Sequence, residues 1–231
     1  HLTVELASDA ATLQAAQALR FQVFGQECGA QLHSADEGLD QDHYDLHCEH
    51  LIVRDQRSGQ VVATTRILDS SRAGAAGGFY SESEFQLVGL ADLRGDIMEI
   101  GRTCVHADYR NGATISVLWS GLAQLMNERQ YGYLMGCASI PLNEGYARTI
   151  AIVNHLREKH FTPENMRAEP KVHMPRIDVD IDGKSLVPSL LKAYLRIGVK
   201  VCGEPCLDKD FNVADALILL AREDINQRYL R

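Results

Sequence analysis

The sequence predicts an α/β protein, of the α+β kind, in which a mixed and largely antiparallel sheet is flanked by helices. Two observations predict this class. Apolar runs of strand length recur along the chain, two of them joined by a tight turn, and segments with helical periodicity separate several others. The 231 residues are 45% hydrophobic, which is enough for one sizeable core, so we expect a single domain over residues 1–231.

The first elements are a strand at 2–7 (LTVELA) and a helix from Ser8-Asp9 to about residue 27. Either polar residue can accept hydrogen bonds from free backbone N–H groups at the helix start, and apolar residues follow at 13, 16, 19 and 23. Residues 28–47 are polar and irregular. The runs HLIVRD and QVVATTRILD then flank a turn at 56–59, which predicts an antiparallel hairpin.

In the rest of the chain, SSRAGAAGG (70–78) predicts a flexible loop and IMEIGRTCV (97–105) a strand. A helix at 113–129, a strand at 133–139 and a helix at 144–158 follow. IDVDID (177–182) alternates like an exposed strand, and residues 185–198 predict a helix that Gly198 ends. Residues 199–203 and 214–221 supply the last strands.

Composition argues against two classes of protein. The net charge of −8, from 31 acidic and 23 basic residues, disfavours general nucleic-acid binding. No apolar run reaches the roughly 18 residues of a membrane-spanning helix, and we expect a cytoplasmic protein. The six scattered cysteines are interpreted as small buried thiols of a reducing compartment. His and Cys residues crowd at 43–50 without a closed zinc pattern, so we expect no metal site.

The strand at 97–105 carries the first candidate site residues, Glu99 and Arg102. They are three apart, so a regular strand would place them on opposite faces. Gly101 between them predicts a bulge, which would bring both side chains to one pocket and separate this strand from the next. The alternative is a structural ion pair, which the spacing alone favours slightly.

The helix after this strand opens with YRNGAT (109–114). Free backbone N–H groups at a helix start attract anions, and Gly112 lets a ligand approach closely. A lone glycine turn is more often a plain loop, but its position between this strand and this helix indicates an anion site.

Strand, bulge, V-x-x-x-Y-R-x-G and helix resemble the acyl-coenzyme-A cradle of the Gcn5-related N-acyltransferase superfamily, and the order of elements is similar to that fold. The resemblance implies a cradle over about 97–130. The implied phosphopantetheine-binding residues are Val105, Arg110, Asn111, Gly112, Ala113 and Thr114. Thr114 stands where the superfamily has a second glycine, which favours a donor with one phosphate, the phosphopantetheine of an acyl carrier protein, over coenzyme A.

A second set of polar residues resembles that of acyl-homoserine-lactone synthases, which move acyl chains from acyl carrier protein onto an amino-acid-derived amine. Besides Glu99 and Arg102, the matching residues are Arg20, Phe24, Asp42, Asp45 and Arg66. Ala30 stands where those enzymes carry a tryptophan, which disfavours a lactone product.

Three longer blocks are similar to the L-ornithine Nα-acyltransferases of ornithine lipid synthesis, some of which are called hemolysin-like: DLHCEHLIV, EIGRTCVHADYRNG and LLKAYLRIGVKVCGEPCLDKDFNVADALILL. The last block lies in a C-terminal family-specific segment over 186–231. The resemblance implies transfer of a 3-hydroxyacyl chain from acyl carrier protein to ornithine, with no permanently bound cofactor and with peripheral contact at the inner membrane through the lipid product.

The expected chemistry assigns a role to each group. Glu99, directly or through a water, takes the proton of the attacking amine, and backbone N–H groups near Cys104 and Val105 stabilise the oxyanion. Arg102, with Asp45, Arg20 and Arg66, forms a charged network that orders the loop and meets the carboxylate of the amino acid.

Lys192, Arg196 and Lys200 follow each other at intervals of four. Such a stripe is more often a solvated helix face, but an acidic enzyme that serves an acidic carrier protein needs a local basic dock. Two alternative functions stay open: an N-acyl amino acid synthase that acts on glycine, tyrosine or another amine, and a non-catalytic module that binds acyl carrier protein or lipid.

Overall fold

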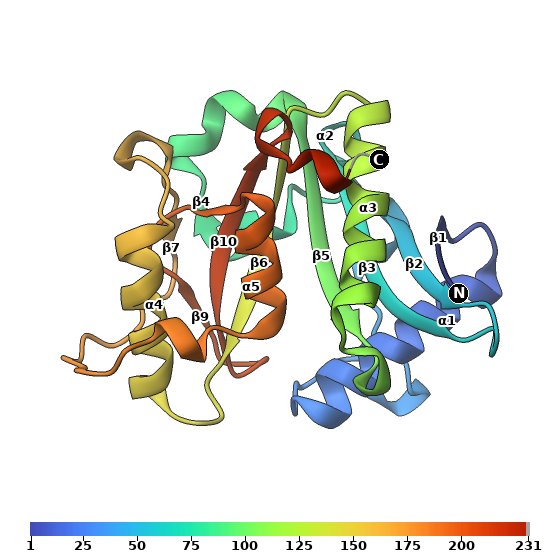
Figure 1. Cartoon of the computed structure of the whole chain (residues 1–231), viewed down its shortest axis with the longest axis horizontal. Helices are drawn as coiled ribbons and strands as arrows, with labels where there is room; N and C mark the ends of the chain where they lie inside the picture. Colours follow the sequence, from blue (N-terminus) through green and yellow to red (C-terminus); the bar gives the residue numbers. More distant parts are fainter. Residues whose placement is uncertain (230–231) are drawn as a thin grey trace.

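The computed structural model describes residues 1–229 and has one large mixed sheet with helices on both faces (Figure 1). Within the described residues its strand order is β1-β2-β3-β5-β6-β10-β8, with β9 beside β10. Among these neighbouring strands only β5 and β6 are parallel, and the other pairs are antiparallel. The sheet is therefore mixed and largely antiparallel, as predicted. Residues 230–231, the end of the expected C-terminal segment, lie outside the described residues.

The strands of the large sheet are β1 Leu2–Leu6, β2 Glu49–Asp55, β3 Val61–Asp69, β5 Ile97–Val105, β6 Tyr133–Pro141, β8 Lys200–Val201, β9 Cys206–Asp208 and β10 Val213–Ala221. Two short strands, β4 Phe85–Gln86 and β7 Glu169–Pro170, pair separately. The helices are α1 Ala10–Arg20, α2 Ser70–Ala73, α3 Gly112–Glu128, α4 Tyr146–Lys159 and α5 Ser189–Ile197. None of the described helices is both long and apolar enough to span a membrane.

The core has a layer on each face of the sheet. Alternating residues of β2 show the division, because Leu51 and Val53 belong to the core layer that includes α3, whereas Ile52 belongs to the layer that includes α1. The face that α1 covers is completed by α2 and the segment that leads to β5, where Phe79, Phe85 and Leu90 are buried. Both faces of the sheet are therefore closed by packing, and space for a ligand is left where the sheet opens.

The sheet opens between β5 and β6. These strands pair only over Ile97–Ile100, after which β6 continues with β10 and β5 with β3. The register of β3 against β5 shifts so that Arg102 and Thr103 face one residue, and Arg102 has a φ of +50°. The predicted bulge is therefore present, directly after Gly101. At the last paired position a Cβ on Gly136 would lie 2.6 Å from the Ile100 carbonyl oxygen, so a glycine is required there.

Three predicted elements differ from the structure. The first helix is capped by Asp9, which accepts from Thr12 N at 2.7 Å, but changes at Phe21–Glu27 to a π-helical segment. The predicted loop at 70–78 begins as α2, capped by Asp69 and buried through Ala73. Residues 177–182 form no strand, because their alternating Ile and Asp residues lie exposed without a partner strand.

Candidate active site

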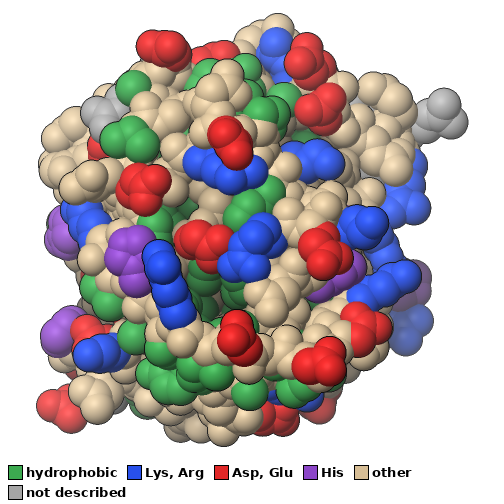
Figure 2. All heavy atoms as spheres, turned by 90° about the vertical axis from the view of Figure 1, so that its left-hand side faces the viewer, with side chains coloured by type: hydrophobic (Ala, Val, Ile, Leu, Met, Phe, Trp, Pro, Cys, Tyr) green, Lys and Arg blue, Asp and Glu red, His purple; other side chains and the backbone are tan. Residues whose placement is uncertain are grey.

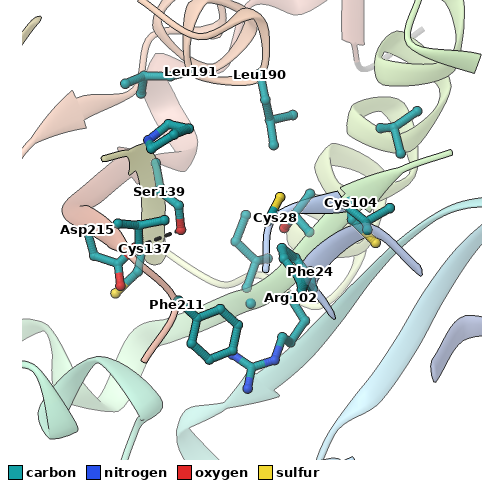
Figure 3. Close-up of a pocket in the computed structure, with 18 of the residues that line it drawn as sticks. Phe24, Cys28, Arg102, Cys104, Cys137, Ser139, Leu190, Leu191, Phe211 and Asp215 are labelled. Carbon is teal, nitrogen blue, oxygen red and sulfur yellow. Dashed lines mark hydrogen bonds between the residues drawn. The ribbon is translucent and has the colours of Figure 1, made fainter. Parts of the chain in front are cut away.

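A cavity of about 390 Å³ fills the opening between β5 and β6 (Figure 3). Much of its wall is apolar, with contributions from Val23, Phe24, Ile100, Val105, Ile115, Leu190, Leu191, Phe211 and Val213. Its polar lining includes Arg66, Tyr80, Arg102, Ser139, Asp208 and Asp215. In Figure 3, Leu190 and Leu191 lie across the pocket from Arg102 and Phe211. An apolar wall that faces charged groups suits an acyl chain joined to a polar reacting group.

Six charged side chains form a closed ring of alternating arginines and aspartates beside this cavity. In order, the ring runs through Arg20, Asp45, Arg66, Asp42, Arg102 and Asp40. Each neighbouring pair has an N···O distance of 2.5–3.4 Å. Three positive and three negative charges thus balance within a largely buried network, which is the condition under which buried charges are tolerated.

The ring connects four parts of the fold. Arg20 ends α1, Arg66 lies on β3, Arg102 forms the bulge of β5, and the aspartates belong to residues 40–45. Burial opposes ionisation of Asp45, but the charges and hydrogen bonds of Arg20 and then Arg66 lower its pKa to about 2. The irregular segment after α1 is therefore held against the sheet by ion pairs.

The predicted network of Arg102 with Asp45, Arg20 and Arg66 is present, since all four residues belong to the ring. Arg102 joins it through Asp40 and Asp42. Asp40 was missed, although the repeated spacing of LDQDHYD was a signal for more than two partners.

Glu99 lies buried on β5 beneath the turn that Tyr80–Ser83 forms. Its carboxylate accepts hydrogen bonds from Tyr80 N at 2.8 Å and Ser81 N at 2.9 Å. Burial raises the pKa of Glu99, as a proton acceptor for an ammonium group requires. A small cavity of about 10 Å³, lined also by Arg66, adjoins it and has roughly the volume of one water molecule.

The expected meeting of Glu99 and Arg102 in one pocket is wrong. Arg102 lines the main cavity, whereas Glu99 lines the small one; Tyr80 lines both. The Arg102 guanidinium lies 4.5 Å from the Phe211 ring centroid and 5.5 Å from that of Tyr80. The Tyr80 turn covers Glu99, so proton transfer from the main cavity requires a relay.

At the start of α3, Asn111 caps the helix. Its Oδ1 accepts from Ala113 N and Thr114 N, both at 3.1 Å, so these two donors are already occupied. Arg110 donates to the Val105 carbonyl at 3.1 Å and pairs with Glu27, so it points back toward the main cavity. A Cβ on Gly112 would meet nothing within 4 Å, which leaves open space for a ligand. Phosphate binding here stays a prediction.

Two predicted side chains and three thiols lie along the main cavity. Phe24 meets Phe211 edge-on, with ring centroids 6.1 Å apart, and Val105 follows the bulge. Cys28, Cys104 and Cys137 also line it, and burial is the main factor that raises the pKa of each thiol. The assignment of backbone N–H groups near Cys104 and Val105 to the oxyanion stays a prediction.

The basic residues of the expected dock do not share one helix face. Lys192 and Arg196 lie on α5, but Gly198, with a φ of +116°, ends that helix. Lys200 instead belongs to β8, where its charge helps to lower the pKa of His160 after the larger effect of burial. The face that includes α4 shows interspersed acidic and basic side chains (Figure 2), which does not favour an acidic partner there.

Several lining residues were missed by sequence reasoning. They are Tyr80, Ser139, Asp208, Phe211 and Asp215, together with Glu84 beside them. One signal was available, because Asp215 is the single charged residue in the apolar run ADALILLA. Tyr80 and Phe211 stand in segments without a clear hydrophobic period, so no local pattern indicated what their side chains contact.

Comparison with known proteins places this site in a family. Residues 19–120 match the model of the acetyltransferase (GNAT) domain. The L-ornithine N(alpha)-acyltransferase of Rhodobacter capsulatus is 31% identical over 98% of this chain and 92% of the relative. That of Brucella abortus is 31% identical over 99% of this chain and 87% of the relative.

Solved structures with low identity share the fold. They include the coenzyme-A-dependent acyl-homoserine lactone synthase BjaI, at 14% identity and a TM-score of 0.58 over 100% of this chain and 86% of that one. The N-acyl amino acid synthase FeeM of uncultured soil microbes is 12% identical and has a TM-score of 0.59, and the match covers 96% of this chain and 92% of that one. Because the sequence relatives exceed 30% identity over nearly the whole length, this chain belongs to the L-ornithine Nα-acyltransferase family of GNAT-fold enzymes.

Proposed function

We propose that this enzyme moves a 3-hydroxyacyl chain from the phosphopantetheine of acyl carrier protein to the α-amino group of L-ornithine, giving lyso-ornithine lipid. The class of reaction, amino acid N-acylation, follows from the family. One observation carries the proposal further: the cavity between β5 and β6 joins an apolar wall to arginines and carboxylates within one enclosure. An acyl thioester and a charged amino acid need both.

The donor arm enters past the start of α3. The open space at Gly112 and the positive end of the α3 dipole suit one phosphate, although Asn111 occupies two of the N–H donors there. The apolar wall from Val105 to Leu191 suits the acyl chain. This path supports a donor carried on acyl carrier protein. The carrier is proposed to dock on α5, which presents Lys192 and Arg196 on the same helix that contributes Leu190 and Leu191 to the cavity.

The acceptor amine attacks the thioester carbonyl carbon. Its C–N bond forms as the carbonyl oxygen becomes an oxyanion, which backbone N–H groups after the bulge stabilise. Collapse breaks the C–S bond and releases the thiolate of the carrier, which takes up a proton to become the thiol. Glu99 is the proposed base: its raised pKa suits it to accept the proton that the attacking nitrogen loses, through a water or Tyr80.

Of the three arginines that line the cavity, Arg66 and Arg102 are proposed to bind the substrate carboxylate, and Arg110, which pairs with Glu27, is assigned to the donor arm. Both arginines already form ion pairs with aspartates, so the substrate carboxylate would bind to guanidinium groups that are part of the ring. The product carries a long acyl chain and is a lipid, so we also propose that the enzyme makes peripheral contact with the inner membrane when the product is released.

Product analysis tests the proposal. Purified protein is incubated with 3-hydroxyacyl-acyl carrier protein, or with the matched acyl-coenzyme A, and with ornithine among the twenty common amino acids. Mass spectrometry should show Nα-acylornithine, formed faster from the carrier-bound donor. If glycine or tyrosine is acylated and ornithine is not, ornithine is not the substrate. If the donor binds and no product forms, the protein is not an acyltransferase for these substrates.

A further inference from the structure

A second group of charged residues lines the cavity, apart from the arginine–aspartate ring. Carboxylate oxygens of Glu84, Asp208 and Asp215 all lie within 4.8 Å of one another. Asp215 is 3% exposed and Glu84 8%, and Asp208 and Asp215 face the cavity. In Figure 3, Asp215 lies on the side of the pocket away from Cys104, beside Ser139 and Cys137.

Among the residues that the structure describes, no ion pair joins this acidic cluster to a positive side chain. Within the described residues, Glu84 Oε2 is buried and receives no hydrogen bond. Asp215 Oδ1 accepts from the Ser139 hydroxyl at 2.7 Å, and Asp208 Oδ1 accepts from Phe211 N at 3.1 Å. The nearby Arg102 is engaged by Asp40 and Asp42. Buried carboxylates without a cation are costly to ionise, and burial raises the pKa of Glu84 and Asp215, so the free cluster holds protons. A positive group that arrives with a ligand can displace these protons and pair with the carboxylates.

We infer that Glu84 and Asp215, with Asp208 at the cavity wall, bind the side-chain ammonium group of a diamino acid substrate, the δ-ammonium of ornithine. The inference rests on the proposed function and deepens it. Arg66 and Arg102 take the carboxylate, the cluster takes the side-chain ammonium, and the α-amine is left between them facing the thioester.

The chemistry also says which of the two amines the cluster holds. Neighbouring carboxylates stabilise the protonated form of an amine, and a protonated amine cannot attack a thioester. An acidic cluster therefore suits the amine that must not react. Held there, the δ-amine stays charged and unreactive, so the cluster also directs acylation to the α-nitrogen.

The test compares ornithine with L-norvaline, which has the same carbon chain without the terminal amine. Glu84→Gln and Asp215→Asn should each lower kcat/KM for ornithine by roughly 10²-fold, chiefly through KM, while norvaline changes by less than about threefold. Glu158→Gln, on the exposed end of α4, is the matched control and should change neither. Asp208→Asn, nearer the solvent, should give a smaller loss of the same selectivity.

Binding supplies a readout independent of turnover. Ornithine without donor should raise the melting temperature of the wild type, norvaline should raise it less, and Glu84→Gln should abolish the difference. If Mg²⁺ or Ca²⁺ alone stabilises the wild type but not the variants, and ornithine does not, the cluster is a metal site and the inference fails.

The two levels of the proposal fail differently. A wild type that acylates ornithine, with variants that keep its preference over norvaline, overturns the inference and leaves the proposed function intact. A wild type that acylates norvaline or glycine as readily as ornithine overturns both. Folded variants, shown by unchanged circular dichroism, are required for either conclusion.

Discussion

Arg20 and Arg102 share one oxygen atom: both Nε groups donate to Asp40 Oδ2, at 2.8 and 2.9 Å. The residues lie on α1 and on the β5 bulge, so one carboxylate connects the first helix to the strand that opens the cavity. Asp40 is only 2% exposed. It therefore joins two of the elements that border the cavity.

Asp40→Asn should therefore be strongly destabilising. It leaves two buried arginines without their shared anion, and breaking a buried pair costs about 3–5 kcal/mol in the free energy of unfolding. Urea unfolding measures the loss, and Asp36→Asn, at a neighbouring exposed carboxylate, is the control. A loss below about 1 kcal/mol would show that the ring contributes little to stability.

Glu99→Gln should reduce turnover roughly 10²–10⁴-fold, the usual effect of losing a general base. Because Glu99 accepts one backbone N–H on each oxygen, the amide also loses one acceptor, and the melting temperature should fall modestly. The rate of the wild type should rise with pH through the raised pKa of this carboxyl, and the variant should lack that rise. An unchanged rate at pH 7 would exclude Glu99 as base.

Asn111 offers a test of the phosphate site with stability held constant. Aspartate caps a helix as well as asparagine, so Asn111→Asp should keep α3 stable while its charge repels the phosphate. KM for the acyl donor should rise several-fold, whereas Asn111→Ser, an uncharged cap, should change it little. Equal KM values for the two variants would place the phosphate elsewhere.

The same site predicts the choice of donor. Matched acyl chains should be used far better from acyl carrier protein than from coenzyme A, because Thr114 stands where the superfamily cradle has a second glycine, which favours a donor with one phosphate. Side-by-side kcat/KM values decide this. Equal values for the two donors count against the single-phosphate site.

Reversal of Lys192 and Arg196 to glutamate should raise KM for acyl-acyl carrier protein steeply at low salt. Attraction between charged surfaces is screened over a Debye length of about 8 Å at physiological ionic strength, so the difference from wild type should narrow as salt rises. A short acyl-pantetheine should be unaffected. Lys200→Glu should have a weaker effect, because Lys200 lies on β8 beyond the helix. Equal losses with both donors would exclude docking.

The acidic cluster predicts a pH-dependent stability. Burial, and then the charge of Asp215, raise the pKa of Glu84, and burial raises that of Asp215. The folded state therefore holds protons that the unfolded state releases above about pH 4.3, the ordinary pKa of Glu, so stability falls as pH rises from there through neutrality. Glu84→Gln should remove most of this decrease in stability with rising pH, because the amide does not titrate. Its melting temperature should exceed that of the wild type at pH 8 and approach it at pH 4, and a constant difference would contradict the shift.

Sequence reasoning succeeded where local pattern decides structure. β5 was predicted with its observed bounds because apolar alternation and the following helix start define it, and Gly101 indicated the bulge. Sequence reasoning failed where contacts between residues far apart in the chain determine the local structure. Asp40 receives Arg102 from 62 positions away, and α2 forms because Ala73 is buried under the sheet. Glu84 and Asp215 are brought together only by the packing of the Tyr80 turn against β10.

The raised pKa values of Cys28, Cys104 and Cys137 have a consequence for an enzyme that handles thioesters. A thiolate would exchange with the incoming thioester and retain the acyl group on the protein as a dead-end adduct. Because the neutral thiol is the poorer nucleophile, the burial that raises these pKa values disfavours the exchange, least at Cys28, which is exposed. Transfer of the acyl group to the amine is thereby favoured over transfer to these thiols.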